Sequence, residues 1–130
     1  MKALEQVSIF YEGKIPTLNN MYSQGRSGKR FISQTHKNFK KALYLIAMSQ
    51  NNNNIRKVYF DKKLHVKIQV NFQRRGRDID NTLKPILDAL RGVIFKDDSQ
   101  VYKITILKTE IKDMKECLQI EAEKFDGIDL

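Results

Sequence analysis

Cysteine is almost absent from this sequence, because Cys117 is the only one among 130 residues. One thiol excludes a disulfide framework within the chain and a zinc site built from several cysteines. His36 and His65 also stand without a second nitrogen or sulfur ligand at useful spacing, so we expect structural or surface roles for all three residues. This cysteine usage fits a reducing compartment, and we expect a cytoplasmic protein.

Long hydrophobic runs are missing as well. The longest purely apolar run, Ala42 to Met48, is far shorter than a membrane span, and residues 1–20 lack the continuous apolar segment of a signal peptide. We therefore expect no membrane association and no export. A chain of 130 residues suits one domain with a two-layer core, and we assign residues 1–130 to it.

Several catalytic signatures are absent too. The sequence contains no Ser-His-Asp arrangement, no glycine-rich loop that would cradle phosphates and no dinucleotide-binding fingerprint. These absences exclude the common serine hydrolases and enzymes that use a nucleotide cofactor.

Acidic residues are scarce in the first half of the chain. Residues 12–77 contain 15 lysines and arginines but two acids, whereas residues 78–130 contain 8 lysines and arginines but 12 acids. A basic half that leads into a carboxylate cluster is suited to hold a polyanion near a metal ion, because lysine and arginine neutralise phosphates. The alternative is a merely basic, soluble surface.

Hydrophobic periodicity predicts alternating strands and helices. The predicted elements are strands over 4–11, 64–72, 102–106 and 118–122, and helices over 34–50, with Ser33 as N-cap, and 81–91, with Gly92 after its end. The last two strands flank a charged turn at 111–115 and are expected to form an antiparallel hairpin. The predicted fold is α+β, a mixed sheet with two helices on one face in the order β-α-β-α-β-β. Its middle strand-helix-strand unit should cross right-handed if the two strands are parallel.

Other segments show no period. Residues 51–54 are four asparagines that should end the first helix and act as a linker, and 58–60 are a short strand start or a packed turn. Residues 125–130 are interpreted as a loose acidic tail. Residues 14–31 are interpreted as a basic loop in which aromatic residues stand among cations, suited to contact DNA; the alternative is disorder without nucleic acid. The residues that we expect to bind DNA are Lys14, Asn19, Asn20, Tyr22, Arg26, Lys29, Arg30, Arg74, Arg75 and Arg77.

An acidic cluster follows the central strand. Asp78 and Asp80 lie between that strand and the next helix, because Pro85 is tolerated only near a helix start. In an extended segment, carboxylates at i and i+2 point the same way and can share one ion, and Mg²⁺ prefers such hard oxygen ligands. Asp97 or Asp98 could complete the site. The alternative is that Asp78 or Asp80 caps the helix.

Lys84 stands four residues after Asp80, which places both on one helix face. Its ammonium could reach a phosphate or a leaving oxygen near the metal, or merely form a salt bridge with Asp80. Asn81 should cap the helix or hydrogen-bond an aspartate, and Asp88 is a polar residue of the same helix.

These spaced blocks resemble the RusA-type Holliday junction resolvases. The resemblance rests on Asp-x-Asp-Asn-x-x-Lys at 78–84 after an arginine-rich strand end, on Asp-Asp-x-Gln-Val at 97–101 and on Pro-x-x-Asn-Asn-x-Tyr at 16–22, with the helix and the basic loop between them. It implies metal-binding roles for Asp78, Asp80 and Asp98 and an essential role for Lys84. The interval from Asp80 to the acidic pair is one residue shorter than in the family pattern, so Asp97 remains the alternative ligand.

The resemblance also implies an activity. We expect a Mg²⁺-dependent endodeoxyribonuclease, with Mn²⁺ able to substitute, that resolves four-way DNA junctions by paired symmetric nicks in recombination and repair. Paired nicks need two sites, so we expect a homodimer whose interface lies in the second half of the chain, including residues 101–123. The alternatives are a noncatalytic DNA-binding module and, less favoured because 73–77 are basic, a haloacid-dehalogenase-like phosphatase with Asp78 as nucleophile.

Overall fold

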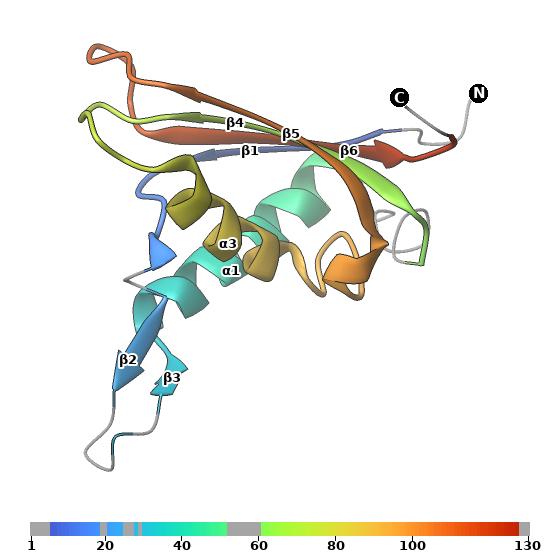
Figure 1. Ribbon diagram of the computed structural model, residues 1–130, viewed down its shortest axis with the longest axis horizontal. Coiled ribbons are helices and arrows are strands. Elements are labelled where there is room, and N and C mark those ends of the chain that lie inside the picture. The colour runs from blue at the N-terminus through green and yellow to red at the C-terminus, as the bar shows by residue number, and fades with distance from the viewer. Residues whose placement is uncertain (1–5, 19–20, 25–27, 29, 52–60, 128–130) are drawn as a thin grey trace.

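A four-stranded sheet forms one layer of the molecule, and helices pack against one of its faces (Figure 1). The computed structural model describes residues 6–18, 21–24, 28, 30–51 and 61–127. In chain order the elements are β1 (Gln6–Glu12), β2 (Tyr22–Gln24), β3 (Arg30–Ile32), α1 (Gln34–Gln50), β4 (Leu64–Asn71), α3 (Ile79–Leu90), the 3-10 helix η2 (Asp98–Gln100), β5 (Val101–Thr109) and β6 (Cys117–Lys124). The predicted α+β class, mixed sheet and single domain are confirmed.

β4 lies inside the sheet, whose order is β1-β6-β4-β5. It pairs in parallel with β5 and antiparallel with β6, and β6 pairs antiparallel with β1. The predicted hairpin is therefore wrong, because β5 and β6 lie on opposite sides of β4. Alternation identifies a strand and its buried face but not its neighbour, so the sequence pattern could not distinguish these pairings.

The core lies between the sheet and the two helices α1 and α3, which cover the same face (Figure 1). Alternate residues of β4 point into it, and each of their side chains is at most 3% exposed. The core residues of these three elements are Leu64, Val66, Ile68 and Val70 on β4, Phe39, Leu43 and Ala47 on α1, and Ile86, Ala89 and Leu90 on α3. Full burial of one such leucine or isoleucine contributes about 1.5–3 kcal/mol, so this face fixes both helices on the sheet.

The boundaries of α1 follow from its caps. Ser33 is the N-cap, and its hydroxyl oxygen accepts the His36 backbone N–H at 3.1 Å. At the other end the Asn51 side chain donates to the carbonyl oxygens of Ala47 and Ser8, both at 2.9 Å. The predicted span of 34–50 is thus confirmed. The rest of the asparagine run and the expected element at 58–60 lie outside the described residues.

Two short strands occur where the sequence predicts only a loop. β2 and β3 pair antiparallel, with Tyr22 opposite Ile32, and the backbone N–H of Ser33 donates to the carbonyl of Met21 at 3.0 Å. Met21 is 1% exposed, so the base of this ribbon is packed. Figure 1 shows the ribbon projecting away from the sheet and the helices.

The end of the chain is also more ordered than the predicted loose tail. The Phe125 backbone N–H donates to the Lys63 carbonyl at 2.8 Å, and its ring stacks on Tyr102 with centroids 5.7 Å apart. These contacts attach the start of the tail to the sheet, while residues 128–130 lie outside the described part of the chain.

Candidate active site

The connection between β4 and α3 presents two carboxylates at the start of a helix. α3 begins at Ile79, two residues earlier than predicted, so Asp80 lies in the first helical turn and not in an extended loop. Asp78 occupies the N-cap position, yet its side chain makes no capping hydrogen bond. The contact between Asp78 and Thr82 involves the Asp78 backbone, whose carbonyl oxygen accepts a hydrogen bond from the Thr82 hydroxyl at 2.8 Å. The Asp78 carboxylate is therefore not used in capping the helix.

Asn81 contacts both carboxylates. Its side-chain amide donates to Asp78 Oδ2 at 3.4 Å, and its backbone N–H donates to Asp80 Oδ1 at 3.0 Å. Both aspartates are exposed, so their negative charges lie together at the surface. The partial positive charge of the α3 N-terminus offsets part of this repulsion, and a divalent cation would offset more.

Lys84 follows one turn later on the same helix. It is exposed and forms no ion pair within 4.0 Å among the described residues, so the alternative of a salt bridge with Asp80 is not realised. Its ammonium is available to an added phosphate. Asp88, another turn along, pairs with His36 and belongs to the packing between α1 and α3.

Asp97 and Asp98 have different surroundings. Asp97 is the N-cap of η2, shares a capping box with Gln100 and accepts a hydrogen bond from the Ser99 hydroxyl at 2.8 Å. The Ser99 hydrogen bond is the main reason that the pKa of Asp97 lies below its ordinary value. Asp97 therefore serves chiefly to hold η2 together.

Asp98 has one oxygen paired and one unpaired. Its Oδ2 accepts a hydrogen bond from Arg91 Nη2 at 3.0 Å, which is also the main cause that raises the pKa of Arg91. Its Oδ1 is shielded from solvent and has no hydrogen-bond partner among the described residues. Asp98 is thus the better candidate for a metal ligand than Asp97.

Asp98 does not lie beside Asp78 and Asp80 in the same chain. It contacts Arg91, which follows the C-terminal end of α3, and eleven residues of helical rise from Asp80 to Arg91 span about 16 Å. Figure 1 shows the start of α3 and η2 at opposite ends of that helix. Among the described residues, no group of three histidines, cysteines, aspartates or glutamates is placed to hold a metal ion.

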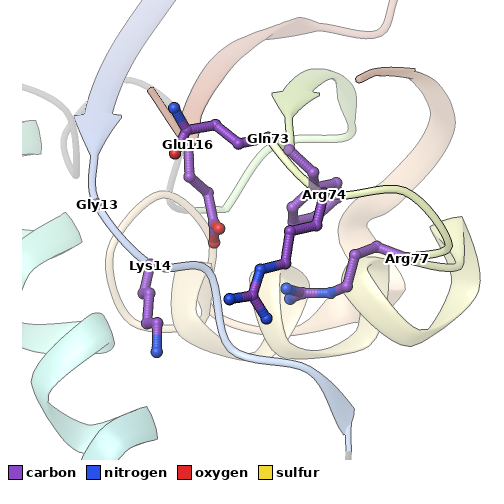
Figure 2. A pocket seen from close by; sticks show the side chains of 7 residues that line it. Gly13, Lys14, Gln73, Arg74, Arg77 and Glu116 are labelled. Carbon is purple, nitrogen blue, oxygen red and sulfur yellow. The ribbon is translucent and has the colours of Figure 1, made fainter. Parts of the chain in front are cut away.

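Three of the residues expected to bind DNA line one pocket. Lys14 comes from the segment after β1, and Arg74 and Arg77 come from the turn that leads to Asp78. The pocket has a volume of about 440 Å³, and among the described residues Glu116 is its one acidic lining residue. Figure 2 shows the two guanidinium groups pointing toward each other, with the side chains of Lys14 and Glu116 directed to the same space. A basic pocket thus includes Arg77, the residue that directly precedes Asp78 in the chain.

The other expected DNA-binding residues are more dispersed. Arg75 is exposed beside the pocket without lining it, and Tyr22 is half-buried on β2. Asn19, Asn20, Arg26 and Lys29 lie outside the described residues. The backbone of Arg30 belongs to β3, but its side chain is not among the described parts of the structure.

Comparison with protein families assigns the chain to one family. The family described as endodeoxyribonuclease RusA matches residues 12–121, which is nearly the whole sequence. The chain belongs to the RusA endodeoxyribonuclease family. No protein of curated function matches it significantly. Family membership implies endonuclease activity of the Holliday junction resolvase type.

Both groups of candidate site residues lie within the segment that matches the RusA family. Asp78, Asp80 and Lys84 at one end of α3, and Asp97 and Asp98 beyond the other, all fall within residues 12–121. In the described part of this RusA chain, no helix has the length and apolar character needed to span a membrane.

The sequence could not identify some residues of the site. Glu116 reaches back 101 positions to accept the Ile15 backbone N–H, and Lys108 donates to the Arg77 carbonyl at 2.7 Å. Arg77 itself donates to the Ile15 carbonyl at 2.9 Å and lies over the Phe72 ring. The three hydrogen bonds join segments far apart in the chain, so no local pattern indicates them.

Proposed function

We propose that this RusA-family protein is a Mg²⁺-dependent endonuclease that resolves four-way DNA junctions by paired symmetric nicks, in recombination and repair. The single observation that supports this most is the constellation at the start of α3 in a chain of that family: two exposed carboxylates, Asp78 and Asp80, and Lys84, which has no ion-pair partner among the described residues. Branched DNA is the proposed substrate.

The donor set fits Mg²⁺, with Mn²⁺ able to substitute. Asp78 and Asp80 offer exposed carboxylate oxygens, and Asp98 has a shielded oxygen without a partner among the described residues. Such hard oxygen ligands, completed by water and phosphate, are typical of Mg²⁺ sites. When bound, the ion supplies an activated water and neutralises negative charge on the phosphate.

The remaining residues of the site bind and orient. Asn81 holds both aspartates through hydrogen bonds, which fixes the directions of their oxygens. Lys84 presents a compact positive charge to the phosphate from the next turn of the helix. Arg91 holds Asp98 by one oxygen and leaves the other available.

A two-fold dimer would bring the separated carboxylates together. β5 is an edge strand whose side chains Tyr102, Ile104 and Leu107 are 56%, 38% and 54% exposed. Asp98 precedes β5, while Asp78 follows the opposite end of β4, which runs parallel to β5. Antiparallel pairing of two β5 strands would place Asp98 of the partner subunit at the end of the sheet where Asp78 and Asp80 lie.

This arrangement refines the proposed interface. β6 has a neighbour on each side within one sheet and offers no free edge, whereas β5 has a neighbour on one side in the part of the chain that the structure describes. An exposed, apolar edge strand is a template for pairing with another chain. The homodimer proposed here therefore uses β5, and neither active site is complete in one subunit.

The decisive experiment measures cutting and binding separately. Asp80→Asn should abolish Mg²⁺-dependent nicking of a labelled four-way junction yet bind it as well or more tightly, because a negative charge beside phosphates is removed. Asp113→Asn, at an exposed position in the turn before β6, is the matched control and should cut normally.

Other outcomes identify the alternatives. A protein that binds junctions but never cuts them with Mg²⁺ or Mn²⁺ is a noncatalytic DNA-binding module. Release of phosphate from small monoesters, abolished by Asp78→Asn, would indicate the phosphatase instead.

A further inference from the structure

The basic pocket beside Asp78 contains cations that the protein leaves largely unused. The side chains of Lys14 and Arg74 have no ion-pair or hydrogen-bond partner among the described residues. Arg77 uses Nη2 to donate to the Ile15 carbonyl, but its Nε is shielded from solvent and has no partner there. A buried donor without an acceptor is costly, so the pocket is suited to an added acceptor.

One wall of the pocket is fixed by backbone contacts. The N–H of Gly13 donates to the Glu116 carbonyl at 3.0 Å, and the N–H of Ile15 donates to the Glu116 carboxylate. Gly13 has φ +149°, and a Cβ at this position would lie 2.9 Å from the hydroxyl oxygen of Tyr11. Only glycine fits this close approach, which sets the position of Lys14.

The opposite wall is fixed from β5. Lys108 donates to the Arg77 carbonyl at 2.7 Å, and the Gly76 N–H donates to the Glu110 carboxylate, which follows β5, at 3.0 Å. The Arg77 guanidinium lies 4.4 Å from the centroid of the Phe72 ring. A binding site whose walls are held in this way loses little conformational entropy when a ligand enters.

The charge of the pocket selects an anion of limited charge. Three cations face one carboxylate, Glu116, which already accepts a backbone N–H. A phosphodiester carries one negative charge and offers two acceptor oxygens, and guanidinium groups match such oxygens in pairs. A cation would be repelled by the lysine and the two arginines, and an apolar ligand would leave them unpaired.

We propose that this pocket holds one backbone phosphate of the DNA strand that is cut, next to the phosphate on which Asp78 and Asp80 act. The inference deepens the proposed nuclease function and rests on it. Arg77 directly precedes Asp78, so their Cα atoms are about 3.8 Å apart. A phosphate in the pocket therefore fixes the register of the strand relative to the carboxylates, within about two nucleotides of the cut.

The test combines changes in the protein with changes in single DNA phosphates. Junctions carrying one uncharged methylphosphonate at successive positions near the cleavage point are bound to the protein in EDTA, so that affinity is measured without cutting. Arg74→Ala removes one cation of the pocket, and Arg75→Ala removes a neighbouring exposed charge that does not line it. Among the described residues, the Arg74 side chain makes no hydrogen bond or ion pair that the substitution would remove.

We expect the wild-type protein to lose affinity about tenfold at one methylphosphonate position within two nucleotides of the cut. Arg74→Ala and Lys14→Ala should bind the unmodified junction less tightly and be insensitive to that replacement. Arg75→Ala should keep the full sensitivity. Equal sensitivity of Arg74→Ala and the wild type at every position would overturn the proposal, as would the lack of a sensitive position.

The result is separable from that of the nuclease proposal. A position-specific pattern in EDTA from a protein that never cuts DNA would support the phosphate pocket and remove the nuclease. Normal Mg²⁺-dependent cutting without such a pattern would support the nuclease function and overturn the phosphate pocket.

Discussion

At the scale of single residues, the two neighbouring acids beyond α3 separate into different roles. Asp97 caps η2 and is engaged by Ser99 and Gln100, whereas Asp98 keeps a shielded oxygen without a partner among the described residues. The sequence places both in the same motif, and the family resemblance implies Asp98 as the ligand with Asp97 as the alternative. The surroundings of each carboxylate favour Asp98.

We therefore predict that the same change, Asp to Asn, affects junction cleavage strongly at Asp98 and little at Asp97. Asp98→Asn should reduce junction cleavage by at least about a hundredfold while binding persists, because a metal-ligand oxygen is lost. Asp97→Asn should retain cleavage within a few-fold and weaken only the η2 cap. Single-turnover cleavage with Mg²⁺ measures both, and an active Asp98→Asn beside an inactive Asp97→Asn would reverse the assignment.

At the scale of elements, the position of α3 depends on a buried pair. His36 on α1 is 1% exposed, and its Nε2 lies 2.8 Å from Asp88 Oδ2 on α3. Asp88 is two turns beyond Asp80 on the same helix, so this contact helps to orient the helix that carries the proposed catalytic residues. The structural role expected for His36 is thereby confirmed.

His36→Ala should lower the free energy of unfolding by about 2–3 kcal/mol, because it leaves a cavity and an unpaired carboxylate. Thr35→Ala, at an exposed position on the same turn, is the control and should change it by less than about 0.5 kcal/mol. Urea unfolding followed by circular dichroism measures both. Equal effects of the two substitutions would show that the pair contributes nothing.

On the face of the sheet opposite to the helices, the charge of one carboxylate, Glu123, depends on pH. Glu123 on β6 accepts hydrogen bonds from Lys67 and His65 on β4, with distances of 3.2 and 3.1 Å. These contacts, chiefly that with Lys67, hold the pKa of Glu123 below its ordinary value of 4.5. The ionised form is favoured by folding, so the contribution is fully present above the unfolded pKa and is lost as pH falls through the folded one.

Glu123→Gln should accordingly destabilise the protein at pH 7, by less than about 1 kcal/mol because the pair is partly exposed. The difference from the wild type should shrink below about pH 4, where the wild-type carboxylate becomes protonated. Urea unfolding at pH 7, 5 and 3.5 measures it. A difference that stays constant over this range would contradict the assignment.

At the scale of the whole molecule, the separation of Asp98 from Asp78 and Asp80 is the main structural result. Two β5 edges paired across a two-fold axis would give two sites, each with Asp78 and Asp80 from one subunit and Asp98 of the partner subunit. Resolution of a junction needs matched nicks in two strands, and the two-fold symmetry of the proposed dimer would supply two facing sites.

This arrangement predicts complementation between inactive variants. A mixed dimer of one Asp80→Asn and one Asp98→Asn subunit places both changes in one site and leaves the other site intact. It should nick a supercoiled cruciform in one strand without linearising it, although each variant alone is inactive. Mixed dimers purified with two different tags provide the measurement, and complete inactivity of the mixed dimer would place all three aspartates within one subunit.

The sequence by itself determined the local structure of this protein. The alternation of β4, the cap of α1 at Ser33 and the spacing of Asp78, Asp80 and Lys84 are properties of neighbouring residues, so they predicted the elements and the family motif. Even there the start of α3 was misplaced by two residues, because Pro85, expected in the first turn, is the seventh residue of the helix.

Only the tertiary structure decided which strands pair and what lies beside the motif. β5 joins β4 in parallel and β6 enters between β4 and β1, which leaves Asp98 at the far end of α3. Glu116, Lys108 and Arg77 meet segments distant in the chain to fix the basic pocket. Such contacts depend on how the apolar faces of all the strands and helices pack together in the core. The hydrophobic period of a single strand contains no information about its neighbours.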